Sequence, residues 1–143
     1  GEDRRGMHVK KLASVVLCAC LLMLCQGCSV KKVNMEKIRD VEITVLEEEK
    51  IPDEFMAQIE EKKSGPFKIT YADKDALYIA RGYGEQKTSG YSIEVKECYE
   101  TENAIYIHTN LIGPSKEEKI VEAKTFPYVA VKMEFIDKNV VFE

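Results

Sequence analysis

Residues 91–112 read YSIEVKECYETENAIYIHTNLI, and the alternation of apolar and polar side chains in this stretch decides the fold. A period of two is typical of strands that bury one face. It predicts one strand over Tyr91–Tyr99 and a second over Asn103–Ile112, with a turn at Thr101-Glu102 between them. We therefore expect an antiparallel hairpin here.

The alternation also assigns each side chain of the hairpin to a face. In the first strand the pattern places on one face Tyr91, Ile93 and Val95, and on the other Ser92, Glu94, Lys96 and Cys98. In the second strand it directs inward Ile105, Ile107 and Leu111, and outward Tyr106, His108 and Asn110.

Five further strands are expected around this hairpin. The period of two predicts them over Val41–Leu46, Phe67–Tyr71, Leu77–Tyr83, Tyr128–Ile136 and Val140–Phe142. The turn Ala72–Asp75 joins the second and third of these, and Asp137-Lys138-Asn139 is expected to close a last hairpin. Ser115–Ala123 is a charged connector that has room for a short helical turn.

One helix is expected between the first two of these strands. Pro52 suits a first helical turn, and the acidic side chains of Asp53 and Glu54 complement the helix dipole. Phe55, Met56 and Ile59 form a narrow apolar stripe, so this helix needs a sheet to pack against. Ser64-Gly65-Pro66 ends it.

The fold class that follows is mainly β, of the α+β kind. We expect an antiparallel sheet of about seven strands, folded as a sandwich or an open barrel, with one packed helix. The 143 residues suffice for one domain, and 45% hydrophobic residues exclude intrinsic disorder. A net charge of −4 gives no basic surface for nucleic acid, so no nucleic-acid partner is expected.

The first 27 residues are expected to be a signal peptide. Lys10 and Lys11 precede an apolar run from Leu12 to Cys25, which as a helix would extend about 21 Å and is too short to span a bilayer. The sequence Leu24-Cys25-Gln26-Gly27 before Cys28 resembles a bacterial lipoprotein lipobox. That resemblance implies cleavage before Cys28 and a lipid on its thiol; an uncleaved or conventionally cleaved signal is the alternative.

This interpretation divides the chain into a signal peptide at 1–27, a lipidated tether at 28–39 and a β-rich body at 40–143. The protein would lie on the extracytoplasmic face of a membrane, held by lipid on Cys28. Cys98 would then be the one thiol in the folded body, without a disulfide partner, and we expect it to be inert rather than reactive.

The sequence predicts no catalytic site, no metal site and no cofactor. His108 is the one histidine of the body, and its outward strand position favours a solvated surface histidine. Gly82–Ser89 carries Gln86 where a phosphate-binding loop needs glycine before Lys87. The consecutive glutamates at 47–49, 60–61 and 117–118 are typical of solvated surfaces.

The most distinctive segment is GYGEQKTSGYSIEV at residues 82–95. Glycines permit backbone angles that other residues avoid, and they frame a polar loop between two strands. Loops on rigid scaffolds often carry recognition, so we expect a protein partner to bind here; an ordinary long hairpin turn is the alternative. The expected contact residues are Gly84, Lys87, Thr88, Ser89, Gly90 and Tyr91.

This segment resembles the C-terminal domain of the PrcB family of protease-complex lipoproteins. Gly84, Thr88, Gly90, Tyr91 and Ile93 match the family pattern G-x-x-P-T-G-G-Y-x-I, and Phe126-Pro127 matches a later element. Lys87 stands where the family has proline, and Ser89 where it has glycine. The resemblance extends over about Tyr78–Phe142.

The resemblance implies a non-enzymatic subunit that assembles with, or stabilises, a secreted or surface subtilisin-like protease. A second similarity gives an alternative function. Thr88-Ser89-Gly90-Tyr91 is similar to the T-T-G-Y loop with which chagasin-type inhibitors enter the cleft of cysteine proteases.

Overall fold

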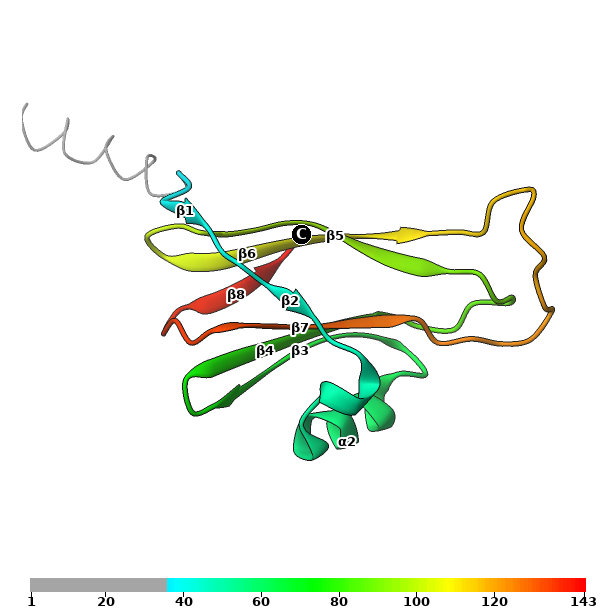
Figure 1. The fold of residues 1–143 in the computed structure, drawn as a ribbon, viewed down its shortest axis with the longest axis horizontal. Coiled ribbons are helices and arrows are strands. Elements are labelled where there is room, and N and C mark those ends of the chain that lie inside the picture. The colour runs from blue at the N-terminus through cyan, green and yellow to red at the C-terminus, as the bar shows by residue number, and fades with distance from the viewer. Residues whose placement is uncertain (1–35) are drawn as a thin grey trace, which may run out of the picture. The chain divides into compact units, whose positions relative to one another are not determined.

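The fold is a sandwich of two four-stranded sheets with one helix on the outside (Figure 1). The computed structural model describes residues 36–143. The first sheet has the strand order β1-β5-β6-β8, and the second has the order β2-β7-β4-β3. Their bounds are β1 Arg39–Asp40, β2 Thr44–Val45, β3 Pro66–Asp73, β4 Ala76–Tyr83, β5 Ser92–Glu100, β6 Ala104–Ile112, β7 Tyr128–Glu134 and β8 Asn139–Phe142.

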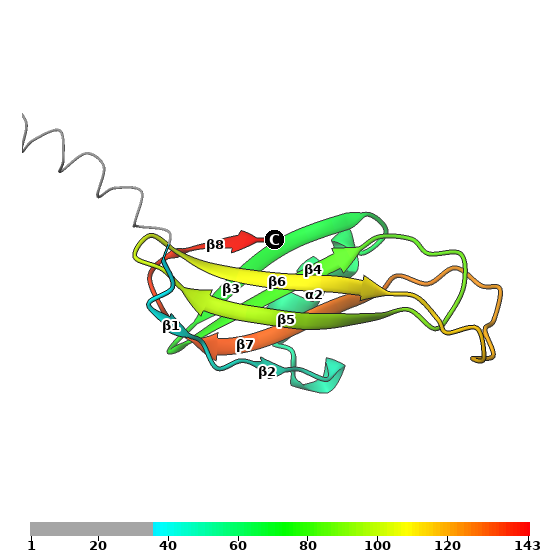
Figure 2. The same ribbon diagram turned by 90° about the horizontal axis from the view of Figure 1, so that it is seen from above.

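The main core lies between the two sheets. Ile105 and Ile107 of β6 face Ile79 of β4 and Val131 of β7, and all four side chains are almost fully buried. The inward positions predicted for Ile105 and Ile107 are confirmed. The structure is therefore a sandwich, which is one of the two architectures expected from the sequence, rather than an open barrel (Figure 2).

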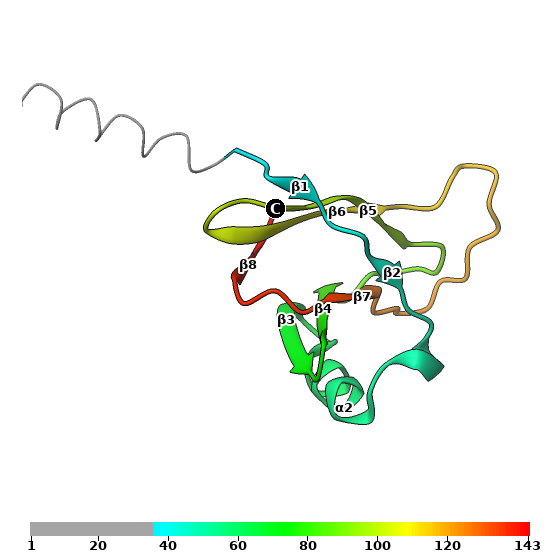
Figure 3. The ribbon, with the colours of Figure 1, turned by 60° about the vertical axis from the view of Figure 1, so that its left-hand side comes forward.

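The helix forms a third layer. Helix α2 (Asp53–Lys62) follows the short 3-10 helix η2 (Glu48–Lys50) and covers the outer face of the second sheet (Figure 3). Phe55 and Ile59 are fully buried there, and the Phe55 ring stacks on Tyr71 with 5.6 Å between centroids. The predicted helix and its need for a sheet are both confirmed, and β4 is consequently buried on both faces.

The single strand predicted over Val41–Leu46 is wrong. The chain forms β1 on β5 and then passes to the other sheet, where β2 pairs with β7. Val41 turns into the core during this passage, whereas Val45 remains 59% exposed. Ile43 also packs against this core, so two side chains anchor the crossing, and the alternation ends before Val45.

The last predicted hairpin is also wrong. Strand β8 does not return along β7; it pairs in parallel with β6, in the other sheet. Val140 and Phe142 of β8 pack against the inter-sheet core, which holds this strand across the sandwich. Residues 36–143 therefore contain eight strands, and the first sheet is mixed rather than antiparallel.

A bulge in β5 overturns the predicted orientation of Cys98. The register with β6 shifts between Val95 and Glu97, so Lys96 is an extra residue without an opposite partner. Residues beyond a bulge point to the opposite face from the one that strict alternation gives them. Cys98 consequently points into the core and is buried.

Candidate functional site

The predicted recognition loop does not stand alone. Residues 84–91, which join β4 to β5, lie beside residues 113–127, which join β6 to β7 (Figures 1 and 2). We call these two segments together the end lobe. It extends from one end of the sandwich, away from the β3–β4 turn.

Hydrogen bonds hold the two segments of the end lobe together. Gln86 and Thr125 form an isolated bridge, with N···O distances of 2.8 and 3.0 Å. The Ser89 N–H donates to the Val121 carbonyl at 3.0 Å, and the Val121 N–H donates to Ser89 Oγ at 2.8 Å. Residues 113–127, called the connector from here on, therefore brace the loop of residues 84–91 along most of its length.

Gly90 makes the close approach of these two segments possible. Gly84 and Gly90 have φ values of +77° and +92°, in the region that favours glycine. A Cβ at Gly90 would lie 2.4 Å from Glu118 Oε2 and 2.7 Å from Pro114 Cβ. Gly90 is thus required both by its backbone angle and by its contact with the connector.

The side chains expected to contact a partner differ in how far the end lobe already holds them. Thr88 and Ser89 are held within the lobe: the Thr88 carbonyl accepts from the Thr125 hydroxyl at 2.7 Å, and Ser89 Oγ accepts from Val121. Tyr91 is half-buried with its ring edge beside Gly113. Lys87 is exposed, so among these side chains it is the one most open to a partner.

The structure adds apolar residues that sequence reasoning missed. Ile120 and Val121 on the connector are 44% and 63% exposed, and Ile112, at the end of β6, is also exposed. Their signal in the sequence is an Ile-Val pair between charged residues of a segment without a period of two. A partner could bury these side chains together with the aliphatic stem of Lys87.

Reactive groups elsewhere show little preparation for chemistry. Burial raises the pKa of the Cys98 thiol to about 11, which keeps it protonated at neutral pH. His108 is half-buried on the outer face of the first sheet, opposite Glu97 in register. Residues 36–143 contain no group of three or more His, Cys, Asp or Glu side chains placed to hold a metal ion.

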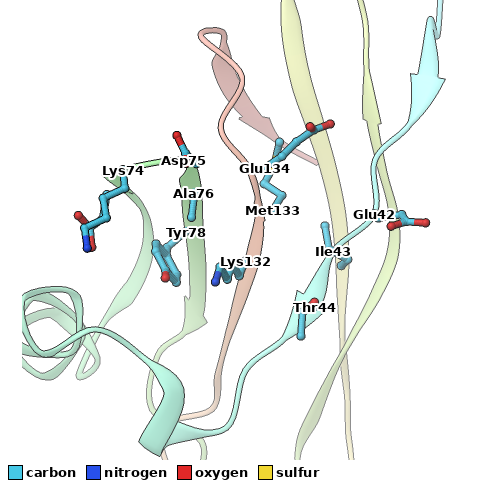
Figure 4. A pocket seen from close by; sticks show the side chains of 11 residues that line it. Glu42, Ile43, Thr44, Lys74, Asp75, Ala76, Tyr78, Lys132, Met133 and Glu134 are labelled. Atoms are coloured by element: carbon cyan, nitrogen blue, oxygen red, sulfur yellow. The ribbon is translucent and has the colours of Figure 1, made fainter.

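A wide hollow lies away from the end lobe. It has a volume of about 810 Å³ and lies over β2, β7 and the β3–β4 turn. Figure 4 shows Tyr78 and Lys132 inside it, and Lys132 Nζ is 5.9 Å from the Tyr78 ring centroid. It is open and its rim is mostly acidic, with Glu42, Asp75 and Glu134, so it lacks the enclosed apolar walls that a small-molecule site needs.

The predicted signal peptide and Cys28 lie outside the described residues. Within residues 36–143, no helix has the length and apolar character required to cross a bilayer.

Comparison with known proteins gives one match. A family model described as PrcB C-terminal matches residues 77–134, which run from β4 through both segments of the end lobe to β7. No curated protein and no solved structure shows significant similarity to the chain.

Proposed function

Residues 77–134 are a PrcB C-terminal domain, and from this premise we propose that the chain is a non-enzymatic, protein-binding subunit. Its partner is a secreted or surface protease of the subtilisin type, which it assembles with or stabilises. The end lobe carries the contact. The chain itself is held on the extracytoplasmic face of the membrane by lipid on Cys28.

The observation that carries this proposal is the apolar surface of the braced lobe. Exposed Ile120 and Val121 lie on a segment whose backbone is fixed by the hydrogen bonds to Ser89 and Gln86. A fixed backbone loses little conformational entropy when a partner binds, so burial of these side chains contributes more fully to affinity. The family match includes both segments.

The bracing also favours this function over the inhibitor alternative. Ser89 Oγ already accepts a hydrogen bond from Val121, and the Thr88 hydroxyl donates to the Ser89 carbonyl at 3.1 Å. A loop that acts as a wedge needs its tip free to enter a cleft. Here the exposed surface is the outer side of the connector.

The lipid anchor raises the local concentration of the lobe near a partner at the same surface. Two acyl chains give stable membrane binding, whereas one chain is marginal. Intact-mass measurement of the protein from its native membranes tests this step. We expect a mass that starts at Cys28 and includes a diacylglyceryl group; a bare Cys28, or residues 1–27 still attached, would contradict it.

Co-purification tests partner binding. The full chain, extracted in mild detergent, should recover a protease, and Val121→Asp should reduce the recovery at least tenfold because an unpaired carboxylate would be buried in the interface. Val45→Asp is the matched control, since Val45 is similarly exposed on β2, in the body of the sandwich. Equal recovery with both variants would overturn the proposal.

A further inference from the structure

Strand β3 offers an uncovered edge for pairing. Its eight residues pair with β4 along one side, and within residues 36–143 no strand pairs with the other side (Figure 3). The opposite margin of the same sheet, β2, has only two residues, and β8 at the margin of the first sheet has four. β3 is thus the longest outer strand of the described sandwich.

Two positive side chains stand together beside this edge. Lys68 of β3 lies directly opposite Arg81 of β4, so both project from the same face of the sheet. This is the face toward the first sheet, because Arg81 Nη1 donates to Thr109 Oγ1 of β6 at 3.2 Å. Like charges at directly opposite positions are normally unfavourable.

No acidic side chain compensates this pair among the described residues. Arg81 makes hydrogen bonds to Thr109 and, at 2.7 Å, to the main-chain oxygen of Glu143, the last residue of the sequence, and it lies over the Tyr83 ring; it forms no ion pair with an acidic side chain. Lys68 is exposed and forms none either. A hollow of about 290 Å³ adjoins both cations, lined also by Pro66 and Tyr83.

From this arrangement we propose that β3 accepts an extended segment of a partner protein as an additional strand, with an acidic side chain of that segment directly opposite Lys68, on the face that also carries Arg81. Backbone hydrogen bonds to the free edge give affinity, and the carboxylate gives specificity. The inference rests on the proposed function only in that the partner is a protein. It uses a different surface from the end lobe.

Charge decides the occupant. An edge-strand lysine is a recognised barrier to indiscriminate pairing, and a second copy of this chain would bring further positive charge to the same face. An acidic segment instead removes the repulsion between Lys68 and Arg81. Opposite charges across a strand pair are favourable, so the carboxylate is the side chain that this position selects.

Synthetic peptides test the proposal. Three labelled eight-residue peptides alternate threonine and valine and carry a central glutamate, glutamine or lysine. Fluorescence anisotropy measures their binding to the full chain in detergent. We expect the glutamate peptide to bind most tightly, Lys68→Glu to weaken it about fivefold, and the lysine peptide to bind the variant better than the original chain.

The matched control is Lys96→Glu, which reverses an exposed lysine on β5 in the other sheet and should leave all three affinities unchanged. Hydrogen exchange shows whether the peptide adds as a strand, because it should slow exchange within Pro66–Asp73. Equal affinity for the three peptides, or unchanged exchange in β3, would overturn the inference. Either result would leave the Val121→Asp test of the end lobe unaffected.

Discussion

At the scale of single residues, the end lobe depends on positions that have no room for a larger side chain. Gly90 combines a φ of +92° with contacts to Pro114 and Glu118. Ser89 joins the loop to Val121 through both its backbone N–H and its hydroxyl. The end lobe is thus fixed by a few local contacts rather than by a core of its own.

Gly90→Ala should therefore destabilise the protein by about 1 to 3 kcal/mol, the cost of a strained backbone angle. Urea unfolding of the full chain measures it. Gly65→Ala is the control, because no atom lies within 4 Å of a Cβ there and its φ is not positive. We expect Gly65→Ala to leave stability unchanged or slightly raised. Equal effects of the two substitutions would show that the lobe is not held as described.

Cys98 gives a prediction about alkaline pH. Burial raises its pKa from the ordinary 9.0 to about 11, so between these values the unfolded chain loses its thiol proton while the folded chain keeps it. The contribution of Cys98 to stability should be complete below pH 9 and should fall as the pH rises toward 11. Unfolding of the original chain and of Cys98→Ala across this range gives the difference. A difference that does not change with pH would contradict the assigned burial.

At the scale of elements, helix α2 is stable because its apolar side packs on the second sheet. Phe55 and Ile59 are fully buried, and the Phe55 ring lies near both Tyr71 and Tyr78. Tyr71 Oη also donates to Glu54 Oε2 at 2.7 Å, which joins β3 to the first turn of the helix. The helix and the β3–β4 hairpin consequently stabilise one another.

Phe55→Ala should cost about 3 to 5 kcal/mol in the free energy of unfolding, because it removes a large buried ring and leaves a cavity. Glu61→Ala, on the exposed side of the same helix, should change stability by about 0.5 kcal/mol at most. Thermal or urea unfolding measures both. A small effect of Phe55→Ala would mean that the helix does not pack on the sheet.

The elements also show which parts of the fold could be predicted from the sequence. The period of two located β3 to β7, and the stripe of Phe55, Met56 and Ile59 located α2, because these patterns are local. The parallel pairing of β8 with β6 joins strands separated by a long connector and β7, and nothing in residues 139–142 encodes it. The bulge at Lys96 leaves a trace in the sequence, because the consecutive polar residues Lys96 and Glu97 interrupt the alternation.

The candidate site, like the fold, could be predicted from the sequence only in its local features. The glycines and the polar loop at residues 84–91 are visible in the sequence, and so is the family resemblance. The docking of this loop on the connector depends on hydrogen bonds between residues more than 30 positions apart, such as Ser89 and Val121. The contact surface that we propose therefore lies on the apolar side chains of the connector rather than on the hydroxyls of the loop.

At the scale of the whole sandwich, the partly buried carboxylate of Glu100 joins segments that are distant in the chain. Glu100 of β5 accepts from Lys138 Nζ at 2.6 Å and from Arg39 Nε at 2.8 Å. Arg39 Nη2 also donates to Glu134 of β7 at 2.7 Å, so the network connects the two sheets. The hydrogen bonds from Lys138 and then Arg39 hold the pKa of Glu100 below its usual 4.5.

A lowered pKa in the fold means that Glu100 stabilises the protein above about pH 4.5 and that this stabilisation is lost as the pH falls below it. Glu100→Gln should reduce stability at pH 7 and reduce it less at pH 3.5. Urea midpoints of both chains at the two pH values measure the difference. An equal difference at both pH values would contradict the hydrogen bonds assigned to the Glu100 carboxylate.

The whole molecule is proposed to act by contact rather than by chemistry, through the end lobe. Site-specific photo-crosslinking in intact cells, read by mass spectrometry, tests this most directly. A crosslinker at Val121 should capture a secreted protease, whereas one at the similarly exposed Val45 should not. Capture of no protein from Val121, or of the same protein equally from both positions, would contradict the account.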